Sequence, residues 1–144
     1  MNILIVYDPT SKQIKNIIQH LTQQLSPNHN IHTVQAGKEQ VTNIIQYDFV
    51  LAMIPQWNYR TKRNITQFFK QHEFPLYTPG AFISNDAIKK ENITDHIHDI
   101  FENAGLSLIS TYTLQPSMSL DQYQQKIEEF THSLNHDLNS YKNT

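Results

Sequence analysis

The 144-residue sequence contains no cysteine and only three glycines. The absence of cysteine excludes disulfide bonds, thiolate zinc sites and catalysis by a thiol, and it fits a reducing compartment. Redox chemistry on this chain would therefore need a bound cofactor. The sequence also contains neither a GxGxxG dinucleotide fingerprint nor a Walker A loop, so Rossmann-type and P-loop nucleotide binding have no support.

Long apolar runs and a strong charge of one sign are missing as well. The longest apolar run, at residues 49–54, is much shorter than the roughly 20 residues that a membrane span requires. The chain starts with a strand-like pattern and not with a secretory signal, so we expect a cytoplasmic protein that does not enter the membrane. The net charge of −2 comes from scattered residues, which gives no electrostatic case for binding nucleic acid.

The apolar residues follow two alternating patterns along the chain. Short runs rich in apolar residues predict strands at 3–7, 31–34, 49–54, 81–84 and 106–114. Apolar spacings of three and four predict helices at 14–25, 38–46, around Phe68 and Phe69, at 93–101 and at 120–138. Pro79-Gly80 marks a turn before the fourth strand, and Gly105 is suited to end the fourth helix.

This succession of β and α elements, without an internal repeat or linker, predicts a single α/β domain over residues 1–144. The expected architecture is a doubly wound, five-stranded parallel sheet with helices on both faces. A ligand of such a sheet binds beyond the carboxyl ends of the strands, where the strand order reverses. The informative residues are therefore those that follow the first, third and fourth strands.

The first strand is followed by Asp8-Pro9-Thr10-Ser11-Lys12-Gln13. A phosphate could be held there by N–H groups at a helix start, by the hydroxyls of Thr10 and Ser11 and by the Lys12 ammonium. A second interpretation stays open, in which Asp8 caps the helix and Pro9 is its first residue. The two compete, because a carboxylate about 6 Å from a phosphate repels it by roughly 2–3 kcal/mol at an effective dielectric near 20.

The third strand is followed by two large aromatic residues, Trp57 and Tyr59, and then by Arg60, Lys62 and Arg63. The aromatic rings could stack on a planar ligand, which is worth about 0.5–1.5 kcal/mol beyond burial, or they could cap the core. The cations would stabilise an anionic ligand, and solvated cations at a helix start explain them equally well. After the fourth strand, Ser84-Asn85-Asp86 could bond to the edge of a heterocycle or form an ordinary turn.

The order and spacing of these segments resemble the flavodoxin superfamily over nearly the whole chain. Residues 1–25 are similar to its first strand, phosphate loop and first helix. Residues 47–69 are similar to its third strand and flavin loop, and the segment IPQWNY especially resembles NAD(P)H-dependent flavin and quinone reductases of this fold. The resemblance implies a flavodoxin-like fold with FMN as cofactor, and it implies NAD(P)H as a substrate if the protein is a reductase.

The resemblance also assigns roles to residues of this chain. The flavin carries out the redox chemistry, so no catalytic side chain is implied. The implied cofactor-binding residues are Thr10, Ser11, Lys12 and Gln13 for the phosphate, Pro55, Gln56, Trp57, Asn58 and Tyr59 for the ring, and Ser84, Asn85 and Asp86 for the third loop.

Several alternatives compete with this interpretation. A phosphoacceptor receiver domain would need an aspartate at the end of the third strand, where the sequence has Met53-Ile54-Pro55. The pairs His96 and His98, and His132 and His136, suggest solvated surface histidines more than a metal site, and we expect no metal. Two functions stay open: a one-electron carrier that acts with a redox protein partner, and a flavin-less interaction module. A homodimer also stays open.

Overall fold

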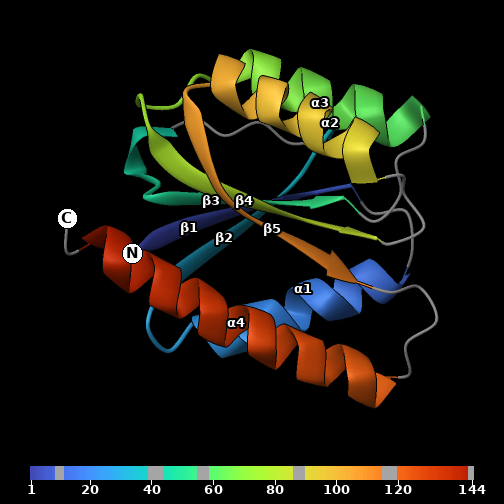
Figure 1. Ribbon diagram of the computed structural model, residues 1–144, viewed down its shortest axis with the longest axis vertical. Helices are drawn as coiled ribbons and strands as arrows, with labels where there is room; N and C mark the ends of the chain where they lie inside the picture. The colour runs from blue at the N-terminus through green and yellow to red at the C-terminus, as the bar shows by residue number, and fades with distance from the viewer. Residues whose placement is uncertain (9–11, 39–43, 55–58, 86–89, 115–119, 143–144) are drawn as a thin grey trace.

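The computed structural model describes residues 1–8, 12–38, 44–54, 59–85, 90–114 and 120–142. Within them, each strand is followed along the chain by a helix or a short 3-10 turn (Figure 1). The strands are β1 (Asn2–Tyr7), β2 (Asn30–Gln35), β3 (Phe49–Ile54), β4 (Thr78–Asn85) and β5 (Leu106–Leu114). The helices are α1 (Lys12–Leu25), α2 (Tyr59–Gln71), α3 (Lys90–Asn103) and α4 (Leu120–Lys142), and a 3-10 turn (Ile44–Gln46) precedes β3. None of the described helices is long and apolar enough to span a membrane.

All neighbouring strands pair in parallel, in the order β2-β1-β3-β4-β5. This is the strand order of flavodoxin-like sheets, in which the order reverses between β1 and β3. Figure 1 shows α2 and α3 over one face of the sheet and α1 and α4 over the other. The predicted fold class, a doubly wound five-stranded parallel sheet with helices on both faces, is therefore confirmed.

The core lies on both sides of the sheet, and β3 is buried along its whole length. Successive residues of β1 alternate between the two sides, because neighbouring side chains of a strand point to opposite faces. Leu4 and Val6 pack with the aromatic residues of α2 and α3, whereas Ile3 and Ile5 pack with α1 and α4. The apolar positions expected on the first and last helices are buried where their side chains are described: Ile17, Ile18, Leu21, Leu25, Ile127, Phe130 and Leu134.

The prediction of a helix at residues 38–46 is wrong for those of its residues that the structure describes. Lys38 belongs to a turn with Gly37, whose φ is +87°, and is not helical. Only the 3-10 turn at Ile44–Gln46 follows, and residues 39–43 lie outside the described part. Ile44 packs against the core from this turn, so its apolar character reflects burial in a short connection and not a helical face.

The fourth strand is longer than expected, because Pro79 and Gly80 lie inside β4 and not in a turn. Gly80 pairs with Val50, and a Cβ atom on it would lie 2.9 Å from Phe101 Cε2 and 3.1 Å from the Val50 carbonyl oxygen. This glycine therefore permits the close approach of α3 to the sheet. The turn comes earlier, at Tyr77, whose φ is +66°.

Candidate functional site

The carboxyl ends of β1, β3 and β4 lie side by side at one end of the sheet. The strand register aligns Tyr7 with Met53, and Ile54 with Ser84. The segments that follow these strands therefore leave the sheet next to one another, beside the point where the strand order reverses. This is the convergence that the sequence predicts for a ligand site.

Asp8 follows β1 and is buried, with 1% of its surface exposed. Its Oδ2 atom accepts a hydrogen bond of 2.9 Å from Oγ1 of Thr61, which lies fully buried in the first turn of α2. Helix α2 has no acidic residue in its own first turn, so Asp8 brings a carboxylate to its positive end. The bond ties the end of β1 to the start of α2.

The structure gives Asp8 a partner on α2 that the sequence does not indicate. The capping of the first helix by Asp8 stays a prediction, because α1 begins at Lys12 and residues 9–11 lie outside the described part. Pro9 lies outside the described residues. The local sequence could not indicate this bond, because Thr61 is 53 positions further along the chain.

The expected phosphate residues fall partly on described structure. Lys12 and Gln13 form the start of α1, whose first turn contains no acidic residue, so its free N–H groups can favour an anion. Thr10 and Ser11 lie outside the described residues.

The expected ring-binding loop is described only at its end. Tyr59 is the first residue of α2 and is 80% exposed. It is therefore not a cap of the core, and its ring is accessible to a ligand. Pro55, Gln56, Trp57 and Asn58 lie outside the described residues, so their expected role stays a prediction.

The third expected loop begins later than the sequence suggests. Ser84 and Asn85 are the last two residues of β4, aligned with β5 as well, and Ser84 is only 5% exposed. The strand predicted at residues 81–84 already includes Ser84, and the ladder with β5 extends it to Asn85, which pairs with Leu114. Asp86 is the first residue beyond the strand and lies outside the described residues.

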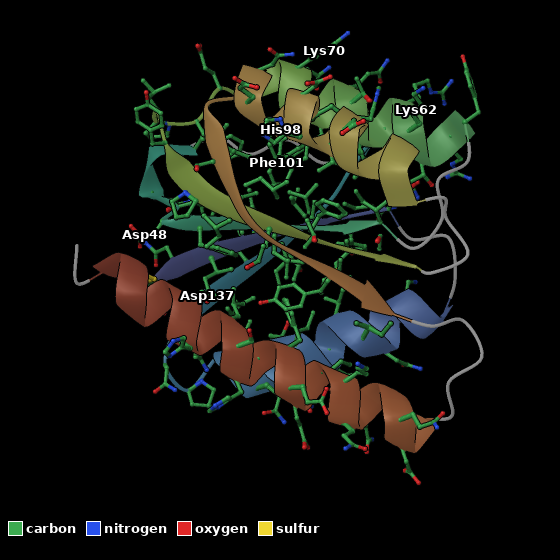
Figure 2. The ribbon with its side chains drawn as sticks, in the orientation of Figure 1. Asp48, Lys62, Lys70, His98, Phe101 and Asp137 are labelled. Carbon is green, nitrogen blue, oxygen red and sulfur yellow. The ribbon has the colours of Figure 1, made fainter. Side chains whose placement is uncertain are left out.

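Three exposed cations, Arg60, Lys62 and Arg63, lie in the first two turns of α2. Figure 2 shows Lys62 at the end of the molecule toward which the strands point, with Asp48 at the opposite end. The cations thus surround the start of the helix that Asp8 contacts. Because they are exposed, salt screens their attraction for an anion over about 8–10 Å.

His96 on α3 is influenced by one of these cations. Burial lowers the pKa of His96 below its ordinary value of 6.5, the charge of Lys62 lowers it further, and Asp99 partly opposes both effects. Because the folded-state pKa lies below the unfolded value, this residue contributes stability that is present above pH 6.5 and is lost as the pH falls through the folded pKa.

We therefore expect the free energy of unfolding to fall on going from neutral pH to about pH 5, and we expect His96→Gln to remove part of that fall. Urea unfolding of both proteins across this range measures the difference. Gln67→Ala, at an exposed position of α2 without a titratable group, is the control and should leave the pH dependence unchanged. Identical slopes for the natural protein and His96→Gln would contradict the assignment.

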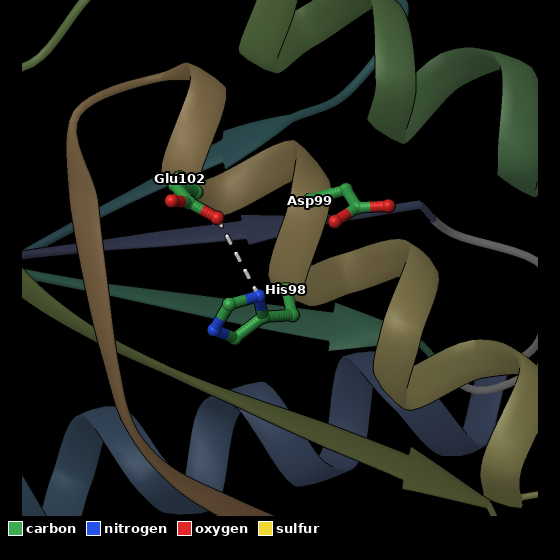
Figure 3. A group of neighbouring side chains, drawn as sticks. All are labelled: His98, Asp99 and Glu102. Carbon is green, nitrogen blue, oxygen red and sulfur yellow. Dashed lines mark ion pairs between the residues drawn. The ribbon is translucent and has the colours of Figure 1, made fainter.

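Within the described part of the chain, one group of side chains has the composition of a metal site: His98, Asp99 and Glu102 (Figure 3). His96 and His98 are close in sequence, but His98 forms an ion pair of 3.7 Å with Glu102, one helical turn away. All three side chains are exposed, and exposed pairs of this kind contribute about 0–1 kcal/mol. His132 and His136 are exposed on α4. His98, His132 and His136 are thus solvated, as the sequence suggests, whereas His96 is partly buried and does not match that expectation.

Comparison with known proteins defines the fold class. No protein-family model matches the chain, and no curated protein matches it in sequence. Solved structures do match. Oxidised Flavodoxin 2 from Bacillus cereus has a TM-score of 0.71 at 15% identity, over 95% of this chain and 99% of that chain. A flavodoxin from the domain Archaea has a TM-score of 0.65 at 11% identity, over 96% and 99%.

A flavodoxin from Streptococcus pneumoniae TIGR4 is similar over the same extent, with a TM-score of 0.63 at 9% identity, over 95% of this chain and 99% of that chain. The similarity thus covers nearly the full length of each protein. The chain therefore has a flavodoxin-like fold, as the sequence resemblance implies.

Proposed function

We propose that the chain binds FMN at the carboxyl ends of β1, β3 and β4 and acts as a flavodoxin-like oxidoreductase in the cytoplasm. The observation that carries the proposal is the hydrogen bond between Asp8 and Thr61, which joins the end of β1 to the start of α2. The segment expected to hold the phosphate follows Asp8, and the segment expected to hold the ring ends two residues before Thr61. The similarity to flavodoxin structures supports the same placement.

The residues present fit a flavin. The start of α1 has no acidic residue in its first turn, and Tyr59 offers an exposed aromatic ring at the start of α2. When bound, the flavin would transfer electrons or hydride, while the chain binds and orients it. We assign the phosphate to Thr10, Ser11, Lys12 and Gln13, the ring to residues 55–59, and the ring edge to Asn85 and Asp86. Ser84 is buried and would support that edge from within β4.

The cations of α2 favour a reductase over an electron carrier. Arg60, Lys62 and Arg63 are exposed beside the proposed ring site, where they can attract the phosphates of NAD(P)H. A one-electron carrier that acts with a redox protein partner is the second candidate, and the flavodoxin structures that match the full length of the chain favour it.

Titration of the purified protein with FMN tests the proposal directly. We expect saturable quenching of flavin fluorescence with a dissociation constant at or below tens of micromolar, about −6 kcal/mol or stronger. The same titration of protein unfolded in urea is the control and should show no saturation. If the folded protein shows none either, the flavin site is refuted and the flavin-less interaction module is favoured.

NADPH oxidation by the FMN-loaded protein, with a quinone as acceptor, separates the two redox functions. For a reductase we expect turnover that falls as salt rises, and that falls again when Arg60, Lys62 and Arg63 are changed together to Gln. Lys70→Gln is the matched control, because Lys70 is exposed in the last turn of the same helix. No NADPH oxidation, combined with rapid electron delivery to a haem protein, would favour the electron carrier.

A further inference from the structure

The turn between α2 and β4 exposes two large side chains next to each other. Leu76 is 73% exposed and Tyr77 is 71% exposed. The backbone of Tyr77 has a φ of +66°, a left-handed conformation that is unfavourable for a residue with a side chain. Among the described residues, Tyr59 is the other large apolar side chain exposed to this extent, and it lies at the opposite end of α2. A strained turn that holds two such side chains in solvent indicates a contact with another molecule.

Hydrogen bonds fix the conformation of this turn. The Tyr77 amide donates to the carbonyl oxygen of Gly105, just after α3, at 2.8 Å. The amide and the hydroxyl of Thr78 both donate to the carbonyl oxygen of Pro75, at 3.1 and 2.7 Å. A surface that is already ordered loses little conformational entropy when it binds, so this turn is suited to recognition.

A cavity of about 400 Å³ lies between α2 and α3 on the same surface. Its wall includes Glu73, three residues before Leu76, and three residues span at most about 11 Å. Phe69 and Ile100 give the cavity an apolar lining. The Oγ1 atom of Thr66 is buried in the wall and has no hydrogen-bond partner among the described residues. The cavity therefore suits an occupant that is mainly apolar and carries a hydroxyl group.

The turn beside the cavity has this composition, and because its side chains are exposed it does not fill the cavity of its own chain. We propose that this surface binds a second copy of the chain about a two-fold axis, with the turn of each copy seated in the cavity of the other. A two-fold axis brings the same patch of both copies together, so a projection beside a cavity is matched twice. Leu76 can cover the apolar lining, and the Tyr77 hydroxyl can bond with Thr66 of the other copy.

The charges at the rim of the cavity are complementary in the same arrangement. Lys70 and Glu73 are both exposed there, and within the described part of the chain neither forms an ion pair. Figure 2 shows Lys70 on the outer side of the layer formed by α2 and α3, away from Lys62. The charged residue in the last turn of α3, Glu102, already pairs with His98 at 3.7 Å. A two-fold contact can therefore place Lys70 of each copy opposite Glu73 of the other.

Sedimentation equilibrium of the natural protein, at chain concentrations from about 1 µM to about 1 mM, measures the association. A contact made by one turn and one cavity is smaller than a permanent interface, so we expect a dissociation constant of about 10–100 µM. Leu76→Ser should weaken the dimer at least tenfold and leave the fold intact, because the side chain is exposed. Lys15→Glu is the control and should leave association unchanged, since Lys15 is exposed on α1 over the other face of the sheet (Figure 1).

Lys70→Glu and Glu73→Lys test the two-fold arrangement itself. Each variant alone brings like charges together at both symmetric contacts and should weaken association about tenfold. A mixture of the two variants restores opposite charges at both contacts of the mixed dimer, so it should associate within about threefold of the natural protein. A change in the folding of either variant could not produce this recovery.

Each outcome decides for or against the dimer. A chain that stays monomeric up to about 1 mM overturns the inference and leaves the cavity to a small ligand or an unlike protein. A dimer that Leu76→Ser and both charge variants leave intact overturns the choice of this surface. Weakened single variants that do not recover on mixing overturn the two-fold contact. None of these measurements needs a flavin, so a negative result does not affect the proposed function.

Discussion

Replacing Phe101 with alanine is expected to lower the free energy of unfolding by about 3–5 kcal/mol. The side chain is fully buried on α3, and its ring centre lies 5.1 Å from that of Phe69 on α2. On its other side it fills the space over Gly80, where a Cβ atom would come within 2.9 Å of it. Because strand and helix backbone surround the ring, the cavity left by alanine cannot close, and the lost contacts are not replaced.

Urea unfolding monitored by circular dichroism measures this loss. Phe101→Leu keeps most of the buried volume and should cost clearly less than the alanine variant. Tyr59→Ala, at an exposed position, should change stability by no more than about 0.5 kcal/mol. A cost below about 1 kcal/mol for Phe101→Ala would contradict the packing of α3 on the sheet through this residue.

Trp57→Ala is expected to weaken FMN binding by about 1–3 kcal/mol, or roughly 5- to 150-fold, with little change in stability. Trp57 follows β3 in the segment expected to pack on the flavin ring, and it lies outside the described residues. Tyr59, two positions later, is 80% exposed, so the start of α2 does not direct its aromatic side chain into the core. An aromatic residue that packs on a ligand loses contacts in the complex and few in the free protein.

Flavin titration and thermal unfolding of the same variant measure the two effects separately. Tyr77→Ala is the control, because Tyr77 is 71% exposed in the turn before β4. This turn lies at the amino end of β4, away from the proposed site at its carboxyl end. It should leave FMN affinity unchanged. A large drop in the melting temperature of Trp57→Ala, with unchanged affinity, would show that Trp57 caps the core and does not hold the ring.

The sequence alone predicted the elements whose pattern depends on burial within one segment. The bounds of β3 and β5 agree with the runs at 49–54 and 106–114, because a strand covered on both faces needs apolar residues throughout. Ile17, Leu21 and Leu25 face the sheet as their helical spacing predicts. Gly105 ends the turn after α3 with a φ of +90°, a conformation that glycine adopts without strain.

Elements that depend on distant partners could not be predicted in this way. The strand character of Asn85 comes from its pairing with Leu114 of β5, and Gly80 belongs to a strand because it pairs with Val50 of β3 and Leu108 of β5. Ile44 has the apolar character of a helical face but packs from a 3-10 turn. In each case the local pattern records that a residue is buried, and it does not record the backbone geometry that buries it.

The candidate site likewise has one part that the sequence predicted and one part that depends on distant partners. The sequence alone placed the ligand beyond β1, β3 and β4, because apolar runs that alternate with helical patterns imply a parallel sheet and its switch point. Only the tertiary structure decided the partner of Asp8, since two residues 53 positions apart meet through the packing of β1 beside β3 and of α2 after it. That contact buries a carboxylate at the edge of the site. The side chain is 99% buried and bonded to α2, a contact that no spacing of residues along the chain reveals.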